Sequence, residues 1–295
     1  TRRSSDLTMA RVIVKTAAVV LRTFRMGETS KLVTLYSENH GKLKVMAKGA
    51  RKPKSKYGGC LEVTNEIQIV CYLRDDRDLQ TLSDAEVVRT HPQLLTDLTR
   101  LAYAGAASEM LDRLTIEHEA NERLYACLTG VLAGLEEVAP AQLESLFWYF
   151  QLRVAAALGY RPELVACTSC GGELTPQACW FSPALGGGVC HSCSREAIAT
   201  AADVNEGGGT TIFGTSTRRV SGESLQFLAV LQAMRTYSRD ELPAAPARSG
   251  EIRNMLRGFL EYHAGASGRL RSLEFLDALG PYQPPHNTAT ANDKD

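Results

Sequence analysis

The chain has 295 residues, of which 44% are hydrophobic and 22% charged, and its formal net charge is zero. This composition is that of a globular protein with room for two or three domains that each bury a core, and it excludes a largely disordered chain. The sequence contains no run of about 18 apolar residues and no secretory leader pattern, so we expect a cytoplasmic protein without a membrane segment.

The charge is distributed very unevenly along the chain. The first 57 residues carry 14 basic and three acidic side chains, and the remaining residues carry an excess of 11 acidic ones. A basic end of this kind is typical of a protein that binds a polyanion, and nucleic acid is the most common extended polyanion of the cell.

Five segments between residues 11 and 89 have the composition of β-strands. Residues 12–21, 31–37, 42–48, 61–73 and 79–88 are rich in Val, Ile, Thr and Leu, and turn residues separate them. Five short strands in about 80 residues favour a small closed barrel of the oligonucleotide-binding (OB) type, with an SH3-like barrel or half a sandwich as alternatives. Residues 1–10 are expected to form a flexible N-terminus.

A helical period begins after this region. Apolar residues recur at steps of three and four between residues 90 and 160, which predicts helices that include 121–138 and 141–158. The second of these contains residues 146–150, which are apolar on every side, so we expect it at the centre of a bundle. A second helical part is expected at 220–280, with helices at 223–237, 251–263 and 269–279, and a loose polar tail at 281–295. The expected fold class is therefore α+β multidomain, with a five-stranded OB-type barrel followed by an α-helical bundle.

Two cysteine pairs interrupt the helical part, in a segment of residues 163–196. Cys167 and Cys170 form one Cys-x-x-Cys pair, and Cys190 and Cys193 form another after 19 intervening residues. This spacing predicts a zinc ribbon inserted in the bundle, with one structural Zn²⁺ whose four thiolates leave no position for water. The alternatives are four unligated or redox-active thiols, or His191 in place of one cysteine.

The basic region contains a strand and a loop. Lys42, Lys44 and Lys48 follow a two-residue alternation that predicts an open positive strand face, and five of the nine residues in the loop 48–56 are basic. A solvated loop without a ligand is the alternative, but next to a lysine-bearing strand we favour binding of phosphates. The predicted DNA-binding residues are Arg22, Arg25, Lys31, Lys42, Lys44, Lys48, Arg51, Lys52, Lys54 and Lys56.

Aromatic residues are few in the predicted barrel. Phe24, Tyr36, Tyr57 and Tyr72 are the ones present from residue 11 to 89. Proteins that recognise bases by stacking usually offer more. We therefore expect contact with the phosphate backbone and little sequence preference.

The sequence lacks the familiar catalytic motifs. Residues 209–216 superficially resemble a P-loop, but Thr215 stands where the phosphate-binding lysine belongs. No zinc-protease motif, nucleophile elbow or dinucleotide-binding motif occurs, and the six histidines form no cluster in the sequence. An enzyme is not indicated.

Three stretches resemble the RecO family of bacterial recombination mediators: residues 21–35 (LRTFRMGETSKLVTL), 40–52 (HGKLKVMAKGARK) and 79–87 (LQTLSDAEV). The resemblance implies a DNA-repair protein of the nucleoid that binds single- and double-stranded DNA and anneals complementary strands without ATP. It also implies work with RecR and binding of the acidic tail of single-strand-binding protein (SSB), so that RecA is loaded on coated DNA. The basic residues from 42 to 56 fall on the family's DNA-binding strand and loop.

Other functions remain open at this point. A zinc-ribbon and OB protein could bind RNA in translation or transcription, and an enzyme such as a DNA ligase or nucleotidyltransferase is a second alternative. The absence of a Lys-x-Asp-Gly sequence argues against the ligase. For the SSB tail, the expected surface is a groove between helices lined with arginine, and the candidates are Arg253, Arg257, Arg269 and Arg271.

Overall fold

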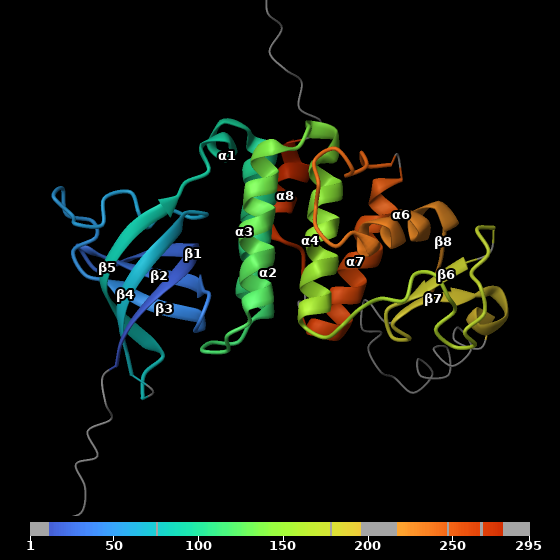
Figure 1. Ribbon diagram of the computed structural model, residues 1–295, viewed down its shortest axis with the longest axis horizontal. Helices are drawn as coiled ribbons and strands as arrows, with labels where there is room; N and C mark the ends of the chain where they lie inside the picture. Colours follow the sequence, from blue (N-terminus) through green and yellow to red (C-terminus); the bar gives the residue numbers. More distant parts are fainter. Residues whose placement is uncertain are drawn as a thin grey trace, which may run out of the picture.

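The computed structural model describes residues 12–279, except for 75, 178, 196–216, 247, 266 and 267. A β-barrel, a helical bundle and a small zinc-ribbon-like sheet follow one another along the long axis of the molecule (Figure 1). The predicted segments 1–10 and 281–295 and the P-loop-like sequence at 209–216 lie outside the described residues. Among the helices described, none is both long and apolar enough to span a membrane.

Five strands form the closed N-terminal barrel, which confirms the predicted OB-type architecture. They are β1 (Val12–Met26), β2 (Ser30–Ser37), β3 (Gly41–Ala47), β4 (Glu66–Leu73) and β5 (Leu79–Arg89). Their order is β1-β2-β3-β5-β4, with β3 and β5 parallel and the other pairs antiparallel. β1 is five residues longer than its composition predicted, because the charged stretch after Leu21 keeps pairing with β2 as far as Met26 and Ser30.

The two faces of the barrel strands have different neighbours. Val33, Leu35 and Val45 point into the barrel and are fully buried in its own core. On the outer face, Leu21 and Tyr36 belong to the core of the helical bundle. The barrel therefore shares a packed interface with the bundle, on the side formed by β1 and β2.

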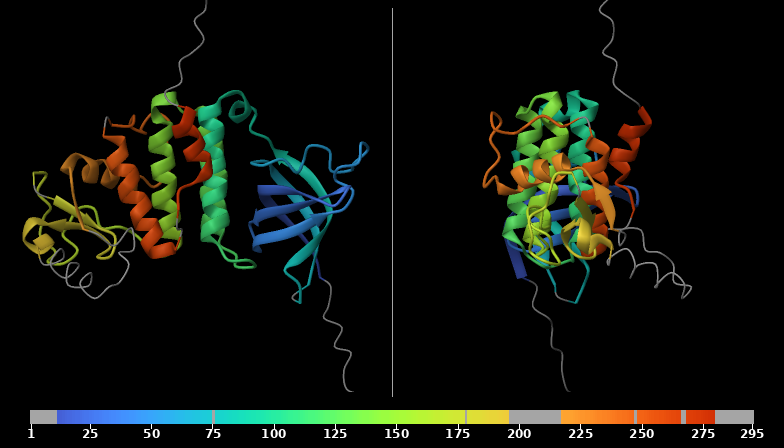
Figure 2. Two further views of the ribbon diagram at one scale, coloured as in Figure 1. Left: turned by 180° about the vertical axis from the view of Figure 1, so that it is seen from behind. Right: turned by 90° about the vertical axis from the view of Figure 1, so that its right-hand side faces the viewer.

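The helices of the bundle come from both sides of the ribbon in the sequence. The first group is α1 (Pro92–Thr96), α2 (Leu98–Leu114), α3 (Glu122–Glu137) and α4 (Leu143–Ala157), with a short 3₁₀ helix η1 (Pro140–Gln142); the second is α6 (Gly222–Ala233), α7 (Ser249–Ala264) and α8 (Arg271–Leu279). Asp97 and Asn121 accept hydrogen bonds from the first N–H groups of α2 and α3, which explains where these helices begin. Figure 2 shows from behind that α2, α3 and α4 stand side by side between the barrel and the ribbon.

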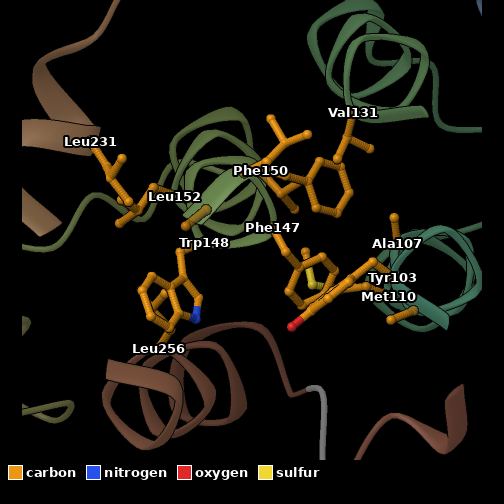
Figure 3. Close-up of a cluster of buried hydrophobic side chains, with 14 of the residues drawn as sticks. Tyr103, Ala107, Met110, Val131, Phe147, Trp148, Phe150, Leu152, Leu231 and Leu256 are labelled. Carbon is orange, nitrogen blue, oxygen red and sulfur yellow. The ribbon is translucent and has the colours of Figure 1, made fainter. Parts of the chain in front are cut away.

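Helix α4 lies at the centre of the bundle, as its apolar sequence predicted. Phe147 points toward Tyr103 on α2, Phe150 toward Val131 on α3, and Trp148 toward α7 (Figure 3). The rings of Tyr103 and Phe147 are 5.4 Å apart. Aromatic residues on several sides of one helix let it contact three neighbours at once, which explains why residues 146–150 are apolar all the way round.

The ribbon contains a three-stranded sheet in the order β7-β6-β8. Its strands are β6 (Cys179–Ser182), β7 (Gly187–Cys190) and β8 (Arg218–Val220). Phe181 of β6 contacts Phe259 of α7, with ring centroids 6.2 Å apart. The third strand, β8, directly precedes α6. The chain therefore enters the ribbon from α4 of the bundle and returns to the bundle at α6.

Candidate nucleic-acid interface and metal centre

The lysine-bearing face of β3 lies against the helical bundle. Lys42 is only 8% exposed, and its Nζ donates a 2.7 Å hydrogen bond to the backbone oxygen of Asp112 on α2. The Asp112 carboxylate lies 3.8 Å from the same ammonium group and 3.4 Å from Arg22. Lys44 forms an ion pair with Glu117. The expectation of an open positive face is therefore wrong for Lys42, which is buried and paired with Asp112. The Lys44 side chain is 40% exposed, but Glu117 pairs with its charge.

Backbone contacts hold this interface in place. The N–H of His118 donates a 3.0 Å hydrogen bond to the backbone oxygen of Lys42, so the segment after α2 pairs with the start of β3. Gly41 has a φ of 62°, and a Cβ at this position would overlap the backbone oxygen of Glu119. Only glycine combines this conformation with such a close approach. The barrel and the bundle are thus joined by main chain as well as by charge.

The basic loop 48–56 is anchored to the barrel at two points. Arg51 donates a 3.0 Å side-chain hydrogen bond to the backbone oxygen of Gly27, and its N–H donates a 2.9 Å bond to Thr29. At the other end, Lys56 donates to the backbone oxygen of Ser83 on β5. These contacts place the loop beside the turn between β1 and β2 and give it a defined position without a core of its own.

The remaining cations of the loop are open to solvent. Lys48, Lys52 and Lys54 are exposed, and their side chains have no hydrogen bond or ion pair within the part of the chain that the structure describes; the same is true of the Arg25 side chain near the end of β1. Lys31, in contrast, pairs with Glu62 at 3.0 Å. Six of the ten predicted contacts therefore form one exposed basic surface: Arg25, Lys48, Arg51, Lys52, Lys54 and Lys56.

The other four predicted contacts, Arg22, Lys31, Lys42 and Lys44, take part in ion pairs. The partners of Arg22, Lys42 and Lys44 were missed by sequence reasoning because Asp112 and Glu117 lie about 70 to 90 residues further along the chain, in the helical part. Glu62, the partner of Lys31, is closer in the sequence but lies outside the predicted basic strand and loop. The loop between β4 and β5, which in many OB folds contacts the ligand, is less suited to phosphate here because it contains Asp76, which pairs with Arg74 at 2.9 Å.

A buried histidine forms a second link between the barrel and the bundle. The side chain of His91 is fully buried, with Nε2 at 3.1 Å from Glu66 of β4 and Nδ1 at 2.9 Å from Glu136 of α3. Arg89 lies 3.6 Å from Glu136. Burial disfavours the charged ring, but the hydrogen bonds to Glu66 and Glu136 outweigh it and raise the pKa of His91 above its ordinary 6.5. No local pattern predicts this cluster, since Glu66 comes from β4, Arg89 from the end of β5, His91 from the residue before α1 and Glu136 from α3.

The four predicted metal ligands come together at the tip of the ribbon. The Sγ atoms of Cys167, Cys170, Cys190 and Cys193 all lie within 4.8 Å of one another, and those of Cys170 and Cys190 are 3.8 Å apart. A tetrahedral zinc with Zn–S bonds of about 2.3 Å requires sulfur atoms about 3.8 Å apart, so the four thiols fit this ion. His191 is not part of the cluster; its ring contacts Trp180, with centroids 5.0 Å apart.

The close approach of the four cysteines shifts the pKa values of two of their thiols. Burial opposes ionisation of Cys167, but the backbone N–H groups of Cys190, Cys170 and Ser169 outweigh it and lower the pKa of this thiol to about 6. Hydrogen bonding with Cys190 and Cys170 raises the pKa of Cys193 to about 12. Thiolates this close repel one another, and a divalent cation is the group that would compensate all four.

Comparison with known proteins agrees with the resemblance seen in the sequence. A family model described as "Recombination protein O N terminal" matches residues 9–91, and one described as "Recombination protein O C terminal" matches residues 95–204. The chain is 35% identical over 280 residues to the DNA repair protein RecO of Pelotomaculum thermopropionicum, covering 95% of this chain and 99% of that one. It is 32% identical to the RecO protein of an Anaeromyxobacter species (strain Fw109-5), covering 91% and 97% of the two chains, respectively.

Proposed function

The chain belongs to the RecO family of DNA repair proteins, and we propose that it acts in recombinational repair by binding single- and double-stranded DNA and annealing complementary strands without ATP. The observation that carries this proposal is the exposed basic surface of Arg25, Lys48, Arg51, Lys52, Lys54 and Lys56 on an OB barrel. Because it is anchored at Arg51 and Lys56, this surface can bind DNA without first ordering a flexible loop.

Annealing by such a surface requires no chemical step. Two complementary strands repel each other through their phosphates, and a row of ammonium and guanidinium groups screens that repulsion and releases condensed counterions. The barrel offers few exposed aromatic rings that would hold bases unstacked, so bases remain free to pair. We propose that the protein is not an enzyme and acts by holding strands close together.

The acidic bundle serves a different purpose. Asp112 and Glu117 fix the barrel to the bundle and confine the free positive charge to the far edge of the barrel, around the loop 48–56. A negatively charged bundle repels DNA and leaves its surface available to proteins. We place the contacts with RecR and with the acidic tail of SSB on this part of the chain, and RecA loading follows from them.

A groove between α3 and α4 supports binding of the acidic tail. It has a volume of about 520 Å³, an apolar floor that includes Leu146 and Phe150, and three arginines on its lining, Arg123, Arg153 and Arg235. No acidic residue is among the described residues that line it. An acidic peptide with an apolar anchor matches this combination.

The arginines suggested by the sequence are less suited to an acidic peptide. Arg253 is already bound to Glu144 at 2.7 Å and lies 3.4 Å from Asp277. The groove that it lines, together with Arg257 and Arg269, also contains these two acidic residues and Glu274. Acidic groups on the lining would repel the tail, so we favour the groove between α3 and α4.

We propose that the four cysteines bind one Zn²⁺ with a structural role. Cys167 and Cys170 would hold the ion from the loop before β6, Cys190 from the end of β7, and Cys193 from the helical residues 191–195 that follow. Zinc bound by four thiolates supplies folding energy and has no open position for a substrate. The ion would reinforce a junction that hydrogen bonds already form, such as those from the Thr168 N–H to the Gly188 oxygen and from the Gly188 N–H to the Glu163 oxygen.

Annealing of complementary strands, naked or coated with SSB and without ATP, tests the proposed function. The variant Lys48→Gln/Lys52→Gln/Lys54→Gln removes three exposed charges that make no contact in the described structure. The matched control, Arg77→Gln/Arg161→Gln/Arg239→Gln, removes three exposed charges elsewhere. We expect the loop variant to anneal about tenfold more slowly or worse, and the control to match the wild type.

Two outcomes would reject this function. Equal annealing by the loop variant and the wild type would show that the basic surface is not used. Absence of annealing and of DNA binding in the wild type, with binding of structured RNA in a competition experiment, would instead support an RNA-binding protein of translation or transcription.

A further inference from the structure

An apolar row on the outer face of the barrel is left uncovered by the bundle. Phe24 of β1 lies opposite Leu32 of β2, which lies opposite Met46 of β3. Phe24 is 47% exposed, and Leu32 and Met46 are partly exposed. The neighbouring row, one step nearer to the bundle, is Arg22, Thr34 and Lys44.

The apolar row therefore lies between two sets of cations. On one side, Arg22 and Lys44 mark the edge of the interface with the bundle, where they pair with Asp112 and Glu117. On the other side, β1 continues into the turn at Gly27, to which the basic loop is anchored through Arg51. A nucleic-acid strand whose phosphates contact the loop would have its bases next to this row.

Phe24 is the aromatic ring of the barrel that is most open to solvent. Tyr36 and Tyr57 are buried, at 0% and 2% exposure, and the Tyr57 hydroxyl donates a 3.0 Å hydrogen bond to Leu82. The guanidinium group of Arg22 lies over the Phe24 ring, 4.7 Å from its centroid. Asp112 holds that guanidinium at 3.4 Å, so the ring is supported on one face by a fixed cation.

We propose that Phe24 stacks on one base of single-stranded DNA, and that Leu32 and Met46 form the apolar floor for the neighbouring base. This inference rests on the proposed DNA binding and adds to it a reason for distinguishing single strands from duplex. The phosphates of either form can contact the basic loop, but only an unpaired strand offers a base face to the ring. Since every base has such a face, the contact brings no sequence preference.

Stacking of one base on Phe24 is compatible with annealing of the rest of the strand. A single ring per barrel holds one base and leaves the others along the strand free to pair. Once the complementary strand pairs with the held base, that base is taken up in the duplex stack and leaves the ring. Phe24 thus favours the substrate of annealing over its product.

The substitution Phe24→Leu tests the proposal, because it keeps an apolar side chain and removes only the ring. Phe275→Leu on α8 is the matched control, since Phe275 is also exposed, at 54%, and lies on the bundle. We expect Phe24→Leu to weaken binding of an oligothymidine about 5- to 150-fold and to leave duplex affinity and the salt dependence of both unchanged. Phe275→Leu should change neither affinity.

A direct signal of stacking comes from Phe24→Trp. We expect its additional fluorescence to be quenched by oligothymidine and not by duplex DNA, relative to the wild type, whose Trp148 is buried in the bundle and whose Trp180 lies on the ribbon. The proposal would be overturned if Phe24→Leu lost affinity equally for single strand and duplex, or lost affinity for neither. It would also be overturned if DNA did not quench the fluorescence of Phe24→Trp. If the wild type bound neither form of DNA, the proposed function itself would fail instead.

Discussion

The buried histidine between the barrel and the bundle yields a quantitative prediction. His91 contacts a carboxylate with each ring nitrogen, Glu66 at 3.1 Å and Glu136 at 2.9 Å. A neutral imidazole has one N–H and can donate to only one of them, whereas the protonated ring donates to both. The two contacts therefore favour the protonated ring, which is also the direction in which the folded protein shifts the pKa of His91.

The substitution His91→Ala would leave two largely buried carboxylates facing each other. Glu66 and Glu136 have side chains that are 14% and 13% exposed, and removing one member of a buried charge cluster costs about 3–5 kcal/mol. Arg89, 3.6 Å from Glu136, can compensate part of this charge. We expect a loss of about 3 kcal/mol in the free energy of unfolding, measured by urea denaturation of the full chain.

The pH dependence of stability follows from the direction of the pKa shift. Because the folded state raises the pKa of His91, the stabilisation is complete below the unfolded value of about 6.5 and is lost as pH rises through the raised value. The slope of unfolding free energy against pH above 6.5 should be negative in the wild type. It should be smaller in His91→Gln, which has no titrating ring.

His118→Asn is the matched control for this experiment. His118 is an exposed histidine in the segment after α2, and its φ of 64° is one that asparagine adopts readily. We expect this variant to keep the stability and the pH slope of the wild type. If His91→Gln had the same pH slope as the wild type, or if His91→Ala cost less than about 1 kcal/mol, the reasoning about a protonated bridge would be refuted.

Three further predictions follow from the interfaces and the metal centre. Lys42→Met should lower the free energy of unfolding by about 3 kcal/mol, because it leaves Asp112 without its buried partner, yet leave the salt dependence of DNA binding unchanged. Gly41→Ala should loosen the barrel from the bundle by a clash with Glu119, seen as faster proteolysis between the two, and unchanged proteolysis would contradict it. Cys170→Ser should reduce bound zinc from one ion per chain to a small fraction by mass spectrometry while the barrel still binds DNA; full zinc content would contradict the four-thiolate site.

Those parts of the fold that depend on local pattern could be predicted from the sequence. The alternation of β-branched residues gave the five barrel strands, and the wholly apolar residues 146–150 gave the central helix α4. The cysteine spacing gave the ligand cluster, because two knuckles of this length are held near each other by the strands between them. In each case the information lies within a few tens of residues.

What the sequence could not show depends on contacts between domains. The alternation of Lys42 and Lys44 correctly indicated an outer face, but only the structure reveals that Lys42 is buried against α2, which supplies Asp112. In the same way, the predicted first strand ended at residue 21, yet Arg22 to Met26 extend β1 because they pair with Ser30 to Thr34 of β2. Burial by another domain leaves no periodic signal in the strand that is buried.

The salt dependence of single-stranded DNA affinity tests the central claim most directly. Six exposed cations on the loop and the hairpin predict a slope of log affinity against log salt of about −4 for the wild type, since each phosphate contact on a single strand contributes about −0.7. Lys48→Gln/Lys52→Gln/Lys54→Gln should reduce the slope to about −2, and Lys42→Met should leave it near −4. A wild-type slope near zero, or an unchanged slope in the loop variant, would contradict the account.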